Sequence, residues 1–247
     1  MRPEIIGRGD LAETLAAMVA AAPPLGDDAP LEIWCVPIDA LRQTVRERRP
    51  GPAHRILVAT RGLEPGTALR ASQVVEAESA CLRLAALAGP VLPAEIARKS
   101  PCAAVVASPH QALRVDAARA LRSPLCRVYE TADLPGVELA GALVDVFAVA
   151  LGAARGLGLG AGAEALLVAR AAVEGARLAS KVGGDPRTFS GLAGVGDLVA
   201  CAASADHPGH RRGLALARGE VLPEVVATCA PLLVQGGRLP IVHGVQA

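Results

Sequence analysis

The chain has 247 residues, enough for one large domain or two small ones, each with its own core. Apolar residues make up 52% of the chain and aromatic residues only 2%, so the core must be built from Ala, Val and Leu. The formal net charge of +1 provides no field of one sign that would hold nucleic acid or an anionic membrane, and both partners are excluded.

Cysteine usage and the N-terminus indicate the compartment. The six cysteines are scattered without CxxC spacing, and a disulfide framework is not expected in a chain of this length without a secretory signal. The sequence passes from Met1 straight into a strand-like run, without the basic and apolar regions of a signal peptide. We therefore expect a cytoplasmic protein.

The first twenty residues read as a short strand, a glycine turn and an amphipathic helix. The spacing GRGDLA over 7–12 fits the dinucleotide fingerprint GxGxxA, in which glycines let the backbone approach a pyrophosphate at a helix N-terminus. The predicted cofactor-binding residues are Gly7, Gly9, Asp10, Leu11 and Ala12. Asp10 would serve as an N-cap but adds negative charge beside a pyrophosphate. An ordinary strand–helix turn explains the pattern equally well.

Further strands and helices alternate as far as residue 135. Strands are predicted over 31–37, 54–60, 102–108 and 126–130, with helices over 38–45, over 72–87 and between the last two strands. The segment 131–135 is the expected hinge, because it leads into residues of a different pattern.

From Gly136 onward the helical pattern is apolar on almost every face. Such a helix lies at the centre of a domain or in a membrane. Glu138, Asp145 and Arg155 interrupt the run, and no uncharged stretch reaches the roughly 18 residues that a spanning helix needs. We therefore predict the buried centre of a helical domain.

Four segments of the chain resemble the bacterial-type NAD(P)-dependent glycerol-3-phosphate dehydrogenases. The family carries ATKGLEPGT, GVELGGALKN, GLGLG and TFxGLAGxGDL segments. Here these read ATRGLEPGT over 59–67, GVELAGALVD over 136–145, GLGLG over 156–160 and TFSGLAGVGDL over 188–198. The resemblance covers nearly the whole chain and implies an α/β plus α fold, with a Rossmann-like dinucleotide-binding half followed by an all-helical domain.

The resemblance also implies that parts of the family fold are missing. A dinucleotide fold places an acid or a basic group about 20 residues past the glycines, at the end of its second strand. Here Asp27 and Asp28 lie at that distance but precede a strand, so they are interpreted as solvated turn residues. We predict that a strand–helix–strand unit is absent and that the last helices are trimmed. The predicted domains are 1–134, a shortened nucleotide-binding domain, and 135–247, a helical substrate or dimerisation domain.

The family's reaction moves a hydride between a nicotinamide and C2 of glycerol 3-phosphate. A carbonyl that becomes an alkoxide needs a cation or an acid beside its oxygen. The family supplies two lysines, and at their positions this sequence has Arg61 and Val144. Arginine keeps the charge but is a poor proton donor near pH 7, and valine keeps neither. Lys99 and Lys181, the remaining lysines, read as surface residues.

The other site positions are partly retained. In the loop that corresponds to the family's phosphate clamp, the first arginine is lost, but Arg211 and Arg212 remain as predicted substrate-binding residues. Asp197 is either a catalytic hydrogen-bond partner or, as we favour, an acid at a helix N-terminus. Cys201, His207 and His210 are not expected to form a metal site, since no fourth ligand is evident.

Two functional hypotheses follow from these residues. The first is a family member that uses NAD or NADP, if either is bound, on a small phosphate ester, with impaired or lost activity. The alternative is a non-catalytic pseudoenzyme that acts as a binding or subunit-interaction module, with a homo-oligomer as one outcome. No nucleic acid, membrane or metal enters either hypothesis.

Overall fold

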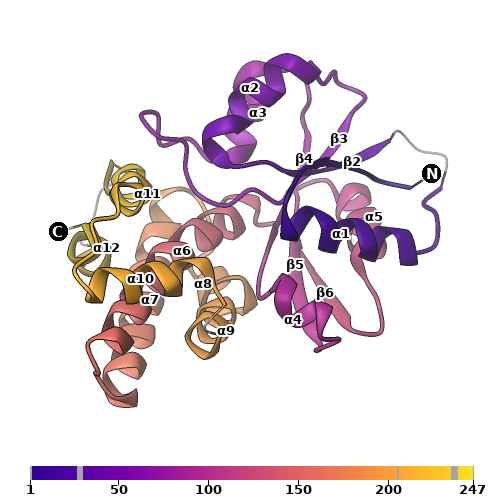
Figure 1. The fold of residues 1–247 in the computed structure, drawn as a ribbon. Coiled ribbons are helices and arrows are strands. Elements are labelled where there is room, and N and C mark those ends of the chain that lie inside the picture. The colour runs from indigo at the N-terminus through magenta and orange to yellow at the C-terminus, as the bar shows by residue number, and fades with distance from the viewer. Residues whose placement is uncertain (1, 27–29, 205, 235–238, 247) are drawn as a thin grey trace.

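The computed structural model describes residues 2–26, 30–204, 206–234 and 239–246, and its N-terminal half is built on a six-stranded sheet (Figure 1). The strands are β1 (Glu4–Gly7), β2 (Leu31–Cys35), β3 (Arg55–Val58), β4 (Arg83–Ala88), β5 (Cys102–Ala107) and β6 (Cys126–Thr131). Asp27 and Asp28, interpreted as solvated turn residues, lie outside the described residues.

Helices cover both faces of this sheet (Figure 1). One face carries α1 (Asp10–Ala21), the short α4 (Pro93–Ala97) and α5 (Gln111–Leu121), and the other carries α2 (Ile38–Arg48) and α3 (Ala71–Glu78). Successive side chains of a strand point to opposite faces of the sheet. Leu57 of β3 therefore packs into the core beneath α1 and α5, and Ile56 and Val58 pack into the core beneath α2 and α3. The result is a three-layer α/β/α arrangement.

The order of the strands in the sheet follows their order in the chain. β1 to β4 are parallel, β5 is antiparallel to β4, and β6 is parallel to β5. In a complete dinucleotide fold the first strand lies between the two halves of the sheet, where the strand order reverses. In the described part of this chain β1 pairs only with β2 and forms an edge. This arrangement agrees with the predicted loss of a strand–helix–strand unit after α1.

Two local predictions are wrong. The helix expected over 72–87 ends at Glu78, and residues 83–88 form β4 instead. β4 is buried between β3 and β5, so its apolar residues face cores on both sides and show no alternation. Asp10 is the first residue of α1 and not its N-cap, which is Gly9, and no side chain caps this helix end.

The C-terminal half is helical and packs around one long helix. Its elements are α6 (Leu134–Gly156), α7 (Ala161–Lys181), α8 (Pro186–Ser190), the π-helical turn η1 (Leu192–Gly196), α9 (Asp197–Ala203), α10 (Pro208–Ala217), α11 (Pro223–Val234) and α12 (Pro240–Gln246). Among the described helices, α6 alone is long and apolar enough to cross a membrane, and 83% of its apolar window is buried in the protein. This burial confirms that it forms the centre of the helical domain.

Glycines allow α6 and α10 to pack with their backbones in contact. A Cβ atom added at Gly152 of α6 would lie 2.1 Å from the carbonyl oxygen of His210, and one added at Gly213 of α10 would lie 2.1 Å from that of Val149. Neither position has room for any side chain. This close contact fixes α10, and with it the N-terminal residues of α10 that face the sheet domain.

Candidate active site

The glycine turn between β1 and α1 has the geometry that the fingerprint requires. Gly7 (φ +119°) packs against β2, where an added Cβ would lie 2.2 Å from the carbonyl oxygen of Cys35. Gly9 (φ +101°) has nothing within 4 Å of such an atom, so its backbone is open to a ligand. The side chain of Ala12, in the first turn of α1, is buried against the sheet domain's core. The turn thus presents the uncapped first turn of α1 to open space.

A cavity of about 580 Å³ separates the sheet domain from the helical domain. Of the predicted site residues, Asp10, Leu11, Arg61, Arg211 and Arg212 line it. Gly7, Gly9, Ala12, Asp197 and Val144 do not line it, although Asp197 contacts Arg61 from behind. The structure therefore brings Asp10 and Leu11, at the start of α1, and the predicted anion-binding arginines to one cavity.

Arg61 is held in the cavity wall by three oxygen atoms. Its Nη2 donates to the carbonyl oxygen of Gly89 (3.0 Å) and lies 2.8 Å from Asp197 Oδ2, in an ion pair whose N–H is not aligned as a hydrogen bond. Its Nη1 donates to Asp145 Oδ1 (3.4 Å). Burial lowers the pKa of Arg61, but the two carboxylates outweigh burial and the net shift is upward. Arg61 is therefore a fixed cation, already neutralised and unable to donate a proton.

Asp197 is fully buried at the start of α9, directly after the π-helical turn. Burial raises the pKa of its carboxyl group, and the attraction of Arg61 partly opposes this shift. Cys201 Sγ contacts Asp197 Oδ1 at 3.9 Å from one turn further along the helix. Asp197 thus contacts Arg61 on the side away from the cavity and does not itself line the cavity.

Val144 does not lie in the cavity, although the resemblance places a catalytic lysine at its position. Its side chain is fully buried in the core of the helical domain. The next residue, Asp145, lines the cavity and contacts Arg61. Where the resemblance places a lysine and an asparagine, this site therefore has an apolar core residue and a carboxylate.

Arginines surround the opposite part of the cavity. Arg211 and Arg212 lie on the first turn of α10, are exposed, and have no ion-pair partner among the described residues. Arg98, which follows α4, also lines the cavity and makes an ion pair of 3.5 Å with Asp206. Sequence reasoning missed Arg98, because nothing in its segment marks it as facing another domain. Together these side chains can bind a phosphate or a carboxylate.

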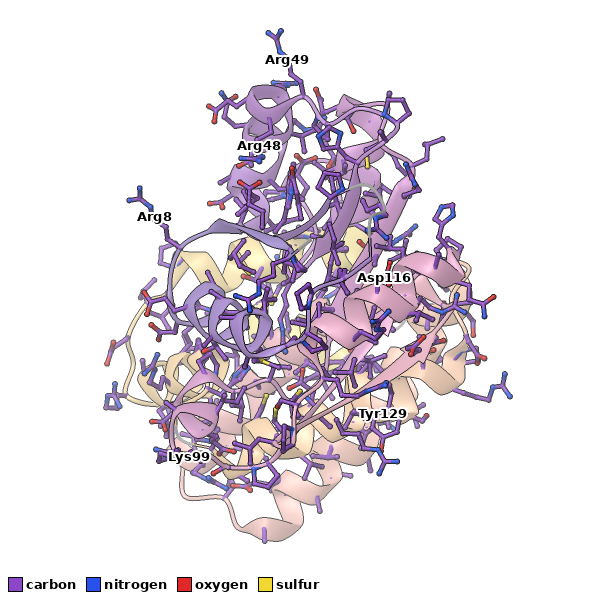
Figure 2. All side chains as sticks on the ribbon, turned by 90° about the vertical axis from the view of Figure 1, so that its right-hand side faces the viewer. Arg8, Arg48, Arg49, Lys99, Asp116 and Tyr129 are labelled. Atoms are coloured by element: carbon purple, nitrogen blue, oxygen red, sulfur yellow. The ribbon has the colours of Figure 1, made fainter. Side chains whose placement is uncertain are left out.

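The histidines and lysines have separate environments. His207 lines the cavity, its Nδ1 accepts from the backbone N–H of Gly209 (3.2 Å), and its Nε2 lies 3.9 Å from Asp145 Oδ1. His210 is buried beside α6 and has no hydrogen-bond partner in the described residues. Lys99 and Lys181 are exposed, and Figure 2 shows Lys99 projecting from the surface. Neither lysine lines the cavity.

The residues fit one part of a nicotinamide dinucleotide. A pyrophosphate above Gly9 would meet the free N–H groups of the first turn of α1, although the carboxylate of Asp10 opposes it. The second mononucleotide-binding half of a complete fold would lie beyond β1. In the described part of the chain no strand lies there, so the adenosine has no platform.

A mostly parallel sheet with a glycine turn after its first strand, joined to a helical domain across a cavity, defines a two-domain dehydrogenase fold of the nicotinamide-dependent class. Residues 5–114 match the N-terminal family model of NAD-dependent glycerol-3-phosphate dehydrogenase, and residues 133–239 match its C-terminal model. The chain belongs to the NAD-dependent glycerol-3-phosphate dehydrogenase family, as the resemblance predicted, and the family depends on NAD or NADP.

Individual relatives agree with this assignment. The glycerol-3-phosphate dehydrogenase (NAD(P)+) of Streptomyces avermitilis is 38% identical over 229 residues, which cover 91% of this chain and 68% of that protein. That of Alkalilimnicola ehrlichii is 44% identical over 174 residues, which cover 70% and 52%. The crystal structure of glycerol-3-phosphate dehydrogenase from Coxiella burnetii matches with a TM-score of 0.88 at 25% identity, covering 99% of this chain and 93% of that one.

Proposed function

We propose that this protein binds a small phosphate ester in the cavity between its two domains and has impaired or lost dehydrogenase activity. The neutralised state of Arg61 carries this proposal. The guanidinium contacts Asp197, Asp145 and the Gly89 carbonyl oxygen, so little of its charge remains for a developing alkoxide. Removing a preorganised charge of this kind typically costs about 3–4 kcal/mol of transition-state stabilisation.

Within this proposal, the residues at the predicted catalytic positions have structural roles. Asp197 and Arg61 form a structural ion pair at the wall, and Val144 contributes to the core. Lys99 and Lys181, both within the described ranges, do not line the cavity, so neither can donate a proton to the substrate oxygen there. Arg211 and Arg212 retain the second requirement of the family reaction, a cationic clamp for the phosphate. Binding would then be kept while hydride transfer is lost.

NAD or NADP, if either binds, would contact the turn formed by Gly7, Gly9, Asp10, Leu11 and Ala12. The bound pyrophosphate would lie over Gly9, which has no neighbour within 4 Å of an added Cβ, and over the N-terminus of α1, where Asp10 and Leu11 line the cavity. Because the adenosine platform is absent from the described residues, we expect weaker binding than a complete dinucleotide fold provides. We place the protein in the cytoplasm, since its long apolar helix is buried in its own core.

Calorimetric titration tests binding and a spectrophotometric assay tests activity. The purified protein would be titrated with NADH, NADPH, glycerol 3-phosphate and dihydroxyacetone phosphate, and NADH oxidation would be followed with dihydroxyacetone phosphate. We expect heat with the phosphate esters and no turnover. The double variant Arg211→Gln/Arg212→Gln should weaken phosphate-ester binding by at least about tenfold. Arg170→Gln, on exposed α7, is the matched control. Turnover at the rate of an ordinary dehydrogenase would refute the loss of activity, and absence of any heat would refute the binding site.

An exposed apolar stripe on α7 favours the subunit-interaction module as the alternative. Leu166 and Val173 are 63% and 47% exposed and lie on one face of the helix, and Leu157 and Leu159 are exposed just before it. A second copy of the chain is the occupant that this alternative names. Analytical ultracentrifugation would detect a dimer that Leu166→Glu disrupts. A monomer at high concentration would refute this alternative.

A further inference from the structure

Two cysteines begin neighbouring strands of the sheet at the same level. Cys102 is the first residue of β5 and Cys126 the first residue of β6, and the parallel register of the two strands pairs them directly. Neighbouring strands lie about 4.8 Å apart, and side chains paired in this way point to the same face. This separation falls within the 4.4–6.8 Å range of Cα distances that disulfides span.

The paired register places the two thiols close enough to affect each other's ionisation. The neighbouring Cys126 thiol lowers the pKa of Cys102, although desolvation partly opposes the shift. The neighbouring Cys102, together with burial, raises the pKa of Cys126. One thiol of the pair is therefore disposed to ionise and the other to remain protonated. This asymmetry is typical of an attacking cysteine and its resolving partner.

The pair can be reached from solvent. Both cysteines line a shallow, open hollow at the end of the sheet, together with Arg122, Arg127 and Tyr129. Cys126 is buried, whereas Cys102 is partly exposed. Arg127 lies over the Tyr129 ring with 5.4 Å between the guanidinium carbon and the ring centroid, and Figure 2 shows Tyr129 at the surface. Glu130 also lines the hollow and lies 3.8 Å from Arg122, but the two arginines outnumber this carboxylate, so the hollow favours an anionic reagent over a cationic one.

We propose that Cys102 and Cys126 form a redox-active dithiol that a low-molecular-weight anionic disulfide, such as glutathione disulfide, oxidises to an intramolecular disulfide. Cys102 first loses its proton, and the resulting thiolate attacks one sulfur of the reagent to form a mixed disulfide; the reagent's S–S bond breaks, and the first thiolate leaves with the electron pair and takes up the released proton. The Cys126 sulfur then loses its proton and attacks Cys102 Sγ, releasing the second thiol. The protein loses two electrons, and one disulfide is reduced to two thiols.

The backbone around both residues allows the bond to close. Cys102 follows the loop after α4, and Cys126 follows a turn in which Ser123 Oγ accepts from the backbone N–H of Cys126 (3.0 Å). The ends of strands adjust more readily than their centres. The other four cysteines, Cys35, Cys81, Cys201 and Cys229, are all buried at separate places in the fold, and they should not react.

Peptide mapping of the full chain tests the proposal. The protein is equilibrated with glutathione disulfide and glutathione, quenched in acid, alkylated and digested with trypsin without reduction. Cleavage after Lys99, Arg114, Arg122 and Arg127 places the two cysteines in separate peptides, 100–114 and 123–127. We expect a linked pair of these peptides and at least about a tenfold loss of free alkylated Cys102 peptide. The four buried cysteines serve as internal controls. They should remain free thiols during the equilibration and become alkylated only when the protein is unfolded.

Single variants separate the two roles. In Cys126→Ser the mixed disulfide should accumulate on Cys102, because the resolving thiol is gone. In Cys102→Ser, Cys126 should remain unmodified, and circular dichroism verifies that both variants fold. A linked peptide found only in a disulfide-bonded dimer on a non-reducing gel would overturn the proposal. Free thiols at both positions after equilibration, or equal modification of Cys126 in Cys102→Ser, would also overturn it.

Discussion

Two histidines lie at the start of α10 in different surroundings. His207 lines the cavity and its Nδ1 accepts from the backbone N–H of Gly209, whereas His210 faces α6. Burial lowers the pKa of His207 from 6.5 to about 4, a shift that Asp145 only partly opposes. A neutral imidazole with its proton on Nε2 is therefore the form that the folded protein holds.

The pH dependence of stability follows from this difference. Between pH 6.5 and 4 the unfolded chain protonates His207 and the folded chain does not, so the unfolded state binds more protons. The contribution of His207 to the free energy of unfolding is then complete above pH 6.5 and is lost as the pH falls to 4, by about 2–3 kcal/mol in all. We expect urea denaturation to show His207→Asn losing less stability between pH 7 and 4.5 than the unmodified chain.

Asparagine is the appropriate replacement because it also caps helix N-termini. The variant should therefore match the unmodified protein at pH 7.5, which serves as the control for the cap. An unchanged acid slope in His207→Asn would show that His207 titrates normally in the folded state.

At the scale of an element, the β1–α1 turn distinguishes two uses of glycine. Both Gly7 and Gly9 have positive φ, but only Gly7 packs against neighbouring backbone. The first glycine is needed for packing of the sheet, and the second for access to the helix N-terminus. Alanine at the two positions should therefore affect different properties.

Gly7→Ala should lower the free energy of unfolding by about 3 kcal/mol or more, because its Cβ would overlap the Cys35 carbonyl oxygen in addition to the strain of positive φ. Gly9→Ala bears only the backbone strain of its φ +101°, ψ 177° conformation, about 1–3 kcal/mol, and is the matched control for the added overlap at Gly7. Thermal and urea denaturation measure both changes. Equal losses in the two variants would contradict this assignment of the close contact to Gly7.

The elements also show where a sequence suffices to predict structure. Strands were predicted over 31–37 and 54–60 from their apolar runs, and the structure has shorter strands there, over 31–35 and 55–58. β4 was missed because RLAALA has no alternation and follows a true helix, so its neighbours in the sheet decide its conformation. Local pattern cannot show such neighbours.

The residues of the candidate site were likewise only partly predictable from the sequence. The glycine turn was visible from its own spacing and the arginine pair of α10 from the family resemblance; Asp10 and Leu11 of the turn and both arginines line the cavity. The ion cluster at Arg61 was not visible, because Asp145 and Asp197 come from different helices of the other domain. Arg98 also became a site residue only through the packing of the two domains.

At the scale of the whole molecule, a buried carboxylate joins the two domains. Glu138 of α6 accepts through Oε1 from the backbone N–H of Ser72 (2.7 Å), and through Oε2 from Ser72 Oγ (2.7 Å) and Arg70 Nε (3.2 Å). These donors lie at the start of α3 in the sheet domain. Burial raises the pKa of Glu138, and the three donors oppose the shift. The two domains therefore have a second fixed connection, in addition to the ion pairs of Arg61.

We expect Glu138→Gln to weaken this connection and with it the cooperativity of unfolding. The amide would place an N–H group against donors, at a cost of about 1–3 kcal/mol. Scanning calorimetry should then give a calorimetric enthalpy larger than the van't Hoff enthalpy, because the domains no longer unfold as one unit. Glu174→Gln is the matched control: that buried carboxylate accepts from the backbone N–H groups of Ile241 and Val242 within the helical domain. Its replacement should lower stability similarly but leave the enthalpy ratio unchanged, and the same ratio in both variants would show that Glu138 does not couple the domains.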